Sequence, residues 1–344
     1  MLESPVNGSR SLASRASDLV KRGPRRSRTG TILAVSAAAL AAAALYNTYR
    51  ARRVEREHPP TGRFVTVEGV RLHYIERGEG PPVVLLHGNV VTAEDFVLSG
   101  VLGRVARRHR VIAFDRPGFG FSDRPQGGMW APAAQADLLR RAFARLGVER
   151  AVVAGHSWGA LVALALALDH PDAVSGLVLL SGYYDWSLRV DVPLAALPAI
   201  PVVGDVMRYT VSPLLGAALM PLVVRGMFSP RPVPERFAEG FPYGLPVRPS
   251  QIRAEAQDSA TMVPAAAAMW RRLRELRAPV VIMAGTGDRV VDFESHAVRL
   301  HEELPHADLR LVPEVGHMLH YAVPDQVAEA IESVSNGGPA GGYH

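Results

Sequence analysis

The sequence of 344 residues contains no cysteine, and Lys21 is its single lysine. Without cysteine the protein cannot form disulfide bonds, use a thiolate nucleophile or bind a metal ion through cysteine ligands. The same absence leaves the redox compartment undecided. The abundance of alanine and arginine in place of lysine indicates a GC-rich bacterial genome and carries no functional information.

The charge distribution argues against nucleic-acid binding by the folded part of the chain. Residues 1–60 hold 11 of the 38 Lys and Arg residues and 4 of the 33 Asp and Glu residues, a net charge of +7. The rest of the chain therefore holds 27 basic and 29 acidic residues, a net charge of −2. A nucleic-acid-binding domain carries a basic surface, so we expect no nucleic-acid partner.

Motifs for metals, phosphate groups and dinucleotides are also missing from the sequence. Gly118-Phe119-Gly120 has the wrong spacing for a dinucleotide fingerprint, and we find no cluster of side chains with metal-ligand spacing. We therefore expect neither a cofactor nor a metal ion.

The first sixty residues divide into a tail, an apolar segment and a linker. Residues 1–29 are rich in Ser, Arg and Gly without apolar periodicity, which predicts a disordered basic tail. Residues 30–46 are uncharged over 17 positions, which is at the short end for a membrane-spanning helix. Residues 47–62 end in a segment that contains proline and glycine, which predicts a linker with a hinge before the folded part.

Three interpretations of residues 30–46 remain open. We favour a single-pass N-terminal membrane anchor, and the alternatives are a cleaved secretory signal and an alanine-rich helix on a protein or membrane surface. Counted out to Arg10 and Arg15, more basic residues precede the segment than follow it. This distribution favours a cytoplasmic N-terminus and a catalytic domain on the non-cytoplasmic side of the membrane.

From residue 63 onward, short apolar runs alternate with helical patterns. This alternation predicts a parallel sheet with right-handed crossovers, preceded by a hairpin. The predicted strands are 63–67, 70–76, 83–86, 110–114, 151–154, 174–180, 279–284 and 308–312. The predicted helices are 92–107, 132–146, 160–169, 292–304 and 324–334. The pattern assigns residues 63–185 and 277–335 to an α/β core and residues 336–344 to a flexible tail.

The most informative motif is Gly155-His156-Ser157-Trp158-Gly159. It lies between the predicted strand 151–154 and the predicted helix 160–169, and a G-x-S-x-G in that context predicts a nucleophile elbow. The tight turn holds the serine in a strained backbone conformation that exposes its hydroxyl. Side chains at Gly155 and Gly159 would collide with the neighbouring strand and helix.

Together with four further motifs at strand ends, this elbow makes residues 63–334 resemble the α/β-hydrolase fold family. The four motifs are His87-Gly88, Asp115-Arg116-Pro117-Gly118-Phe119-Gly120, Gly285-Thr286-Gly287-Asp288 and Gly316-His317. The resemblance implies an α/β fold with a mostly parallel eight-stranded sheet flanked by helices. It also implies a helical cap, here residues 186–276, inserted after strand 6.

The same resemblance implies a Ser-His-Asp triad. Ser157 is the expected nucleophile, His317 the general base and Asp288 the acid that orients it, in the family's chain order. The expected oxyanion hole consists of the backbone N–H groups of Asn89 and Trp158.

Several neighbouring side chains are alternatives to these assignments. Asp185 follows the sixth predicted strand, where some relatives place the catalytic acid. His320, His87 and His156 lie close to the motifs, and the resemblance makes His87 and His156 structural. Asp115 is expected to brace its loop.

The identity of the nucleophile narrows the expected reaction. His-Gly-Asn and the tryptophan after the nucleophile also resemble the haloalkane dehalogenases, whose Asn and Trp side chains hold the halide. Those enzymes and the epoxide hydrolases attack with an aspartate, whereas this chain has Ser157.

We therefore expect hydrolysis of an uncharged, hydrophobic carboxylic ester through an acyl-enzyme, with a small apolar acyl compound as substrate. Amide, peptide or C–C bond hydrolysis and a non-catalytic binding protein of the same fold are the alternatives.

The sequence does not identify the substrate-binding residues, but the expected cap is rich in aliphatic residues. In the family such a cap forms most of the acyl pocket, so these residues either line that pocket or only pack the cap against the sheet. The residues concerned are Leu194, Leu197, Ile200, Val202, Val203, Leu214, Leu215, Met220, Leu222, Val223, Met227 and Phe228.

Overall fold

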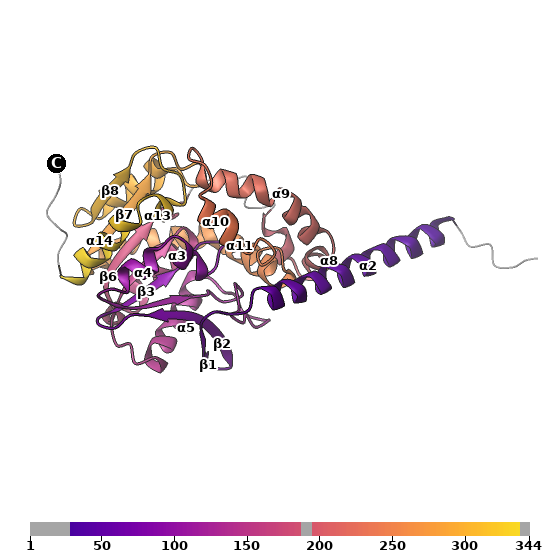
Figure 1. Ribbon diagram of the computed structural model, residues 1–344, viewed down its shortest axis with the longest axis horizontal. Coiled ribbons are helices and arrows are strands. Elements are labelled where there is room, and N and C mark those ends of the chain that lie inside the picture. The colour runs from indigo at the N-terminus through magenta and orange to yellow at the C-terminus, as the bar shows by residue number, and fades with distance from the viewer. Residues whose placement is uncertain (1–27, 187–194, 338–344) are drawn as a thin grey trace, which may run out of the picture.

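A computed structural model describes residues 28–186 and 195–337, and it is built around an eight-stranded sheet (Figure 1). The strand order is β1-β2-β4-β3-β5-β6-β7-β8. β2 pairs antiparallel with both β1 and β4, and every other pairing is parallel. The strands are β1 (Arg63–Val67), β2 (Val70–Arg77), β3 (Pro82–Leu86), β4 (Arg110–Phe114), β5 (Ala151–His156), β6 (Val174–Leu180), β7 (Val280–Gly285) and β8 (Asp308–Val312). The predicted mostly parallel α/β sheet is confirmed.

Helices flank this sheet and fill the connections between its strands. The α-helices of the core are α3 (Glu94–Leu98), α4 (Val101–Val105), α5 (Pro132–Arg145), α6 (Trp158–Asp169), α12 (Arg299–Glu303), α13 (Leu319–Ala322) and α14 (Pro324–Ser335). Outside the core lie α2 (Arg28–Glu57), α8 (Val203–Tyr209), α9 (Val211–Phe228), α10 (Glu235–Gly240) and α11 (Pro249–Trp270). Short helical turns are η1 (Pro171–Ala173), η2 (Leu197–Ala199), η3 (Leu273–Glu275) and η4 (Glu294–Val298).

The central strands are buried on both faces because successive side chains point to opposite sides. In β3, Val84 and Leu86 pack in the apolar layer that contains α5 and α6. Val83 and Leu85 pack in the opposite layer, with α3, α4 and α14. The continuous apolar runs of the sequence thus supply two cores, one on each side of the sheet.

The helix predicted for residues 92–107 is broken in the structure. It forms α3 and α4, which are separated at Gly100, where φ is +81°. Glycine adopts this left-handed conformation without the steric cost of a Cβ atom, so it ends one helix and starts the next at a new angle.

The insertion between β6 and β7 contains two long helices despite its many prolines. α9 has 18 residues and α11 has 22, although they contain Pro221 and Pro264. An internal proline removes one helical hydrogen bond, and tertiary packing can offset that cost. Met220, Val224 and Phe228 of α9 pack in a third apolar cluster, which also includes Met318 and Tyr321 of the core.

Helix α2 continues well beyond the predicted apolar segment, so residues 47–57 of the predicted linker are helical. Arg53 and Glu57 form an ion pair one turn apart, which favours the helix. Asn47 is buried and its Nδ2 donates to the backbone oxygens of Tyr209 and Thr210, at 2.9 and 2.8 Å. α2 is therefore attached to the inserted helices. The tails predicted at 1–29 and 336–344 lie almost wholly outside the described residues.

Two described helices are long and apolar enough to cross a membrane by length and composition. They are α2, whose most apolar window is wholly exposed, and α9, of whose window 28% is buried. A signal sequence or a core helix can pass the same test, so this observation alone does not distinguish an anchor from either.

Candidate active site

Ser157 occupies the sharp turn between β5 and α6. Its backbone angles are φ 53° and ψ −119°, an uncommon conformation for a residue with a side chain. The Ser157 N–H donates to the Leu180 oxygen at 2.8 Å, which ties the turn to β6. The half-buried side chain is thereby presented at the carboxyl end of the parallel sheet.

The two glycines of the elbow allow close backbone packing. A Cβ atom at Gly155 would overlap the backbone of Gly159, and one at Gly159 would overlap the carbonyl oxygen of Leu86 in β3. The predicted collisions at both positions are therefore present in this fold.

Alanine at Gly159 is expected to destabilise the protein by about 2 kcal/mol or more, because the Leu86 backbone must move. Gly103→Ala in α4 is the matched control, since a Cβ atom there meets nothing within 4 Å. Urea unfolding of both variants measures the difference. Equal midpoints for the two variants would contradict the packing argument.

His317 connects Ser157 to Asp288. Its Nε2 lies 2.8 Å from Ser157 Oγ, and its Nδ1 lies 2.8 Å from Asp288 Oδ2. The other carboxylate oxygen, Oδ1, accepts the N–H groups of Val290 and Val291 at 2.8 and 3.0 Å. With Asp288 as acceptor, Nδ1 carries the proton and Nε2 can accept the serine proton. The structure thus brings the three predicted catalytic side chains together.

The alternative acid, Asp185, has another partner. Its carboxylate forms an ion pair with Arg299, and its N–H donates to His296 Nδ1 at 3.3 Å. Asp115 accepts the N–H groups of Ala93 and Phe121 at 2.8 and 2.9 Å, as a loop-bracing carboxylate does.

The histidines near the site also have partners of their own. His87 Nδ1 donates to Gly88 O at 2.7 Å, and its Nε2 accepts the Arg116 N–H at 2.9 Å. Burial, together with the nearby Arg116 guanidinium, lowers the pKa of His87 to about 4. His87 is therefore neutral at pH 7 and fixes the backbone on both sides of it.

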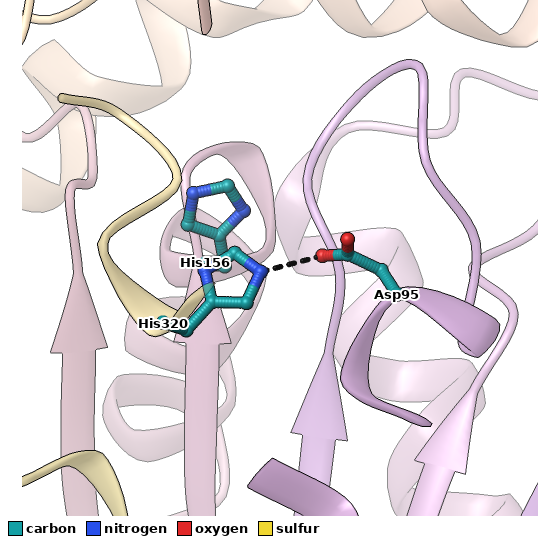
Figure 2. A group of neighbouring side chains, drawn as sticks. All are labelled: Asp95, His156 and His320. Carbon is teal, nitrogen blue, oxygen red and sulfur yellow. Dashed lines mark hydrogen bonds and ion pairs between the residues drawn. The ribbon is translucent and has the colours of Figure 1, made fainter. Parts of the chain in front are cut away.

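Figure 2 shows His156 and His320 side by side, with His320 facing Asp95. His320 Nε2 lies 2.7 Å from Asp95 Oδ2, and Tyr321 Oη donates to Asp95 Oδ1 at 2.8 Å. His156 Nε2 donates to the His317 backbone oxygen at 3.0 Å. Burial lowers the pKa of His156 well below its usual value. These side chains are of metal-ligating types, but their hydrogen bonds suit a structural role: His156 holds the backbone of the predicted catalytic histidine, and Asp95 joins α3 to α13.

A buried arginine that the sequence analysis did not single out lies beneath the predicted oxyanion loop. Arg116 is 0% exposed and forms an ion pair with Asp258 of α11, with Nη1 2.6 Å from Oδ2. Its Nε donates to His87 O at 2.8 Å, and its Nη2 donates to Asn89 Oδ1 at 2.7 Å. Its guanidinium lies 4.5 Å from the centre of the Trp158 ring. Arg116 therefore holds both segments that carry the predicted oxyanion donors.

Asp258 links this arginine to the inserted helices. It also accepts from Arg124 Nη1 at 2.9 Å, and its backbone oxygen accepts the Trp158 indole N–H at 3.3 Å. The sequence offered no local signal for these contacts, because Arg116 and Asp258 are 142 positions apart.

Glu255, one turn before Asp258, contacts the same loop. Its Oε1 accepts the Val90 N–H and Gln251 Nε2, both at 3.2 Å. Val90 directly follows Asn89 and has a φ of +71°. Burial raises the pKa of Glu255 to about 7, so this carboxyl group is partly protonated at neutral pH.

Glu255 is expected to make stability pH-dependent. Its pKa is 4.5 in the unfolded reference and about 7 in the folded protein, so between these two pH values the folded state binds more protons than the unfolded state. Stability therefore falls as pH rises through this window. Glu255→Gln removes this titration, and its Tm should exceed that of the wild type by a few degrees at pH 8 but not at pH 5.

Thermal unfolding at pH 5 to 8 checks this prediction, with Glu68→Gln on the surface as control. Parallel Tm profiles for wild type and Glu255→Gln would contradict it.

Comparison with known proteins places this geometry among hydrolases. A model of the alpha/beta hydrolase fold matches residues 81–322. The 2-hydroxymuconate semialdehyde hydrolase of Pseudomonas putida is 26% identical over 292 residues, which cover 81% of this chain and 95% of that protein.

Solved structures give the same result. Est816, described as an N-acyl homoserine lactone degrading enzyme, is 27% identical with a TM-score of 0.60, over 78% of this chain and 99% of that chain. A membrane phospholipase A, described as a bacterial virulence factor, is similar in fold over 95% of this chain and 99% of that chain. Its TM-score is 0.60 at 23% identity.

Proposed function

The chain belongs to the alpha/beta hydrolase fold family, and on that basis we propose that it is a serine hydrolase of uncharged, hydrophobic carboxylic esters. The observation that carries the proposal is the hydrogen-bonded series Ser157–His317–Asp288 at the strained turn after β5. We further propose residues 63–185 and 277–335 as the core, 186–276 as its cap and residues 30–46 of α2 as a single-pass anchor.

In the first half of the reaction, His317 Nε2 accepts the Ser157 hydroxyl proton while Oγ attacks the ester carbonyl. Asp288 keeps the proton on Nδ1 and stabilises the imidazolium. The backbone N–H groups of Asn89 and Trp158 donate to the oxyanion, and the positive N-terminal end of the α6 dipole supports them. As the C–O bond breaks, the imidazolium protonates the departing alcohol, which leaves an acyl-enzyme.

In the second half, water replaces the alcohol. His317 accepts a proton from water, whose oxygen attacks the acyl carbonyl of Ser157. Collapse of the second tetrahedral intermediate returns the proton to Ser157 and releases the carboxylic acid. Both halves proceed on side chains and backbone groups of this chain, without a cofactor or metal.

The serine nucleophile and the contact of Trp158 argue against dehalogenase chemistry. The side-chain oxygen of Asn89 accepts from Arg116, and the Trp158 indole N–H donates to Asp258 O. The Trp158 indole N–H is therefore not left to hold a halide, and the nucleophile is a serine. C–C bond hydrolysis is the second candidate, because the 2-hydroxymuconate semialdehyde hydrolase aligns over most of both chains.

An acyl-length series of aryl esters tests the ester proposal. If an apolar pocket holds the acyl group, kcat/KM should rise about three- to four-fold per methylene over the first carbons, at about 0.8 kcal/mol each. Ser157→Ala supplies the background rate. A flat profile would contradict the apolar acyl pocket. Faster turnover of prolyl amides would favour amide hydrolysis, and faster turnover of vinylogous diketones would favour C–C bond hydrolysis.

A further inference from the structure

We expected the aliphatic cap residues either to line a pocket or to pack the cap against the sheet. Most of them are instead exposed on the surface. Of the twelve, Leu194 lies outside the described residues, and only Met220, Met227 and Phe228 are buried. The other eight are exposed, from 36% for Leu197 to 72% for Val202. The cap therefore presents its apolar side chains outward.

On α9, beside the exposed Arg225, the exposed apolar residues form one stripe. They follow helical spacing and leave Met220 and Val224 on the opposite, buried face. The exposed stripe consists of Val211, Leu214, Leu215, Leu219, Leu222 and Val223. A helix of a water-soluble domain keeps its outer face polar, so a helix that is apolar on both faces needs an apolar environment outside the protein as well.

The stripe is continuous with α8 and α2. Val203 and Val206 of α8 are 54% and 48% exposed. α2 contacts both α8 and α9, and it projects from the side of the molecule that carries them (Figure 1). Asn47 of α2 bonds to the backbone where α8 ends and α9 begins. The three helices therefore share one outward surface.

Exposed tyrosine and arginine residues border this surface. The uncharged segment of α2 ends at Tyr46, which is 53% exposed, and Tyr49 and Tyr209 nearby are 57% and 39% exposed. Tyrosine is enriched at membrane–water interfaces. Arg50 and Arg52 follow on α2, where basic side chains can contact anionic headgroups.

We propose that the outward face of α8 and α9 is immersed in the bilayer leaflet that α2 enters, and that the enzyme takes its ester substrate from that leaflet. The substrate class is then a bilayer-dissolved acyl ester, and this part rests on the proposed ester hydrolysis. A second copy of the chain covering the stripe is the competing outcome.

Because the natural chain has no cysteine, single-cysteine variants of the full-length protein can be labelled directly. Leu215→Cys and Leu222→Cys report on the stripe, and Leu40→Cys reports on α2. Leu311→Cys is the matched control, since Leu311 is an exposed leucine, 39% accessible, on the edge strand β8, far from α8 in Figure 1. Each variant carries an environment-sensitive fluorophore in phosphatidylethanolamine–phosphatidylglycerol vesicles.

Brominated acyl chains should quench the labels at 40, 215 and 222, whereas aqueous iodide should quench only the label at 311. Iodide quenching at 215 and 222 overturns the inference. Protection from both quenchers also overturns it and indicates a second copy. Iodide quenching at 40 shows instead that the anchor proposal has failed.

A second measurement separates this inference from the proposed reaction. Leu215→Glu with Leu222→Glu should lower hydrolysis of a long-chain ester in vesicles by about tenfold or more, because charge on a lipid-facing helix is costly. Hydrolysis of a short water-soluble ester should be unchanged, and Leu311→Glu should affect neither substrate. If the double variant hydrolyses the vesicle ester as fast as the wild type, the inference is overturned, but the proposed ester hydrolysis is not. If the wild type hydrolyses neither ester, the proposed function fails, and the labelling result still decides the surface.

Discussion

Replacing Ser157 by alanine is expected to lower kcat by about 10⁴- to 10⁶-fold, and His317→Ala should cost about the same. The reason is that attack by the hydroxyl and proton transfer by the imidazole are one event, as the 2.8 Å contact between Oγ and Nε2 indicates. The double variant should therefore be scarcely slower than either single variant.

Asp288→Asn should lower kcat by about 10⁴-fold, since the amide cannot hold His317 in the required tautomer. Asp185→Asn is the matched control, because Asp185 pairs with Arg299 instead. Initial rates on an aryl ester and labelling by a fluorophosphonate probe measure all five variants. Substantial turnover by Ser157→Ala would refute the serine mechanism, and a failure of wild type to react with the probe would favour a binding protein.

Arg116→Met is expected to destabilise the protein by about 3–5 kcal/mol, because it leaves Asp258 buried with one cationic partner fewer. The two side chains are both 0% exposed, so water cannot replace the lost donor. His87 O and Asn89 Oδ1 lose donors in the same substitution. The folded fraction of this variant should also have a lower kcat, because the loop that carries the Asn89 N–H is held in position less firmly.

The surface pair Arg141–Glu68 supplies the control for this substitution. Its side chains are 53% and 65% exposed, and Arg141→Met should cost about 1 kcal/mol or less. Urea unfolding midpoints compare the two variants. Equal losses of stability would show that the buried pair contributes no more than an exposed one.

The sheet could be predicted closely because its signals are local. Short strand patterns between turn residues, apolar runs for β4 and β6 and an alternating one for β8, located these three strands at their observed bounds. The elbow could be predicted for a similar reason, since Gly155 and Gly159 flank Ser157 within five positions. In contrast, the break at Gly100 depends on a backbone angle that one glycine in a helical pattern does not specify.

The contacts around the oxyanion loop could not be predicted, since they join distant parts of the sequence. Arg116 meets Asp258, and Val90 meets Glu255, only because α11 lies across the carboxyl ends of the strands. Likewise, the composition of α9 shows that it is apolar but not that Leu215 and Leu222 face outward. Burial of an aliphatic residue depends on the neighbours that the fold supplies.

The attachment of α2 has a mechanical consequence. Asn47 bonds to the junction of α8 and α9, and Glu55 forms an ion pair with Arg248, immediately before α11. A lateral force on the N-terminal segment therefore acts on the inserted helices as well as on β1, which closely follows α2 in the chain. A helix of 30 residues, about 45 Å long at 1.5 Å per residue, acts on that contact as a lever. With α2 as the proposed anchor, bilayer thickness and curvature would set the tilt of this lever and so act on the proposed cap.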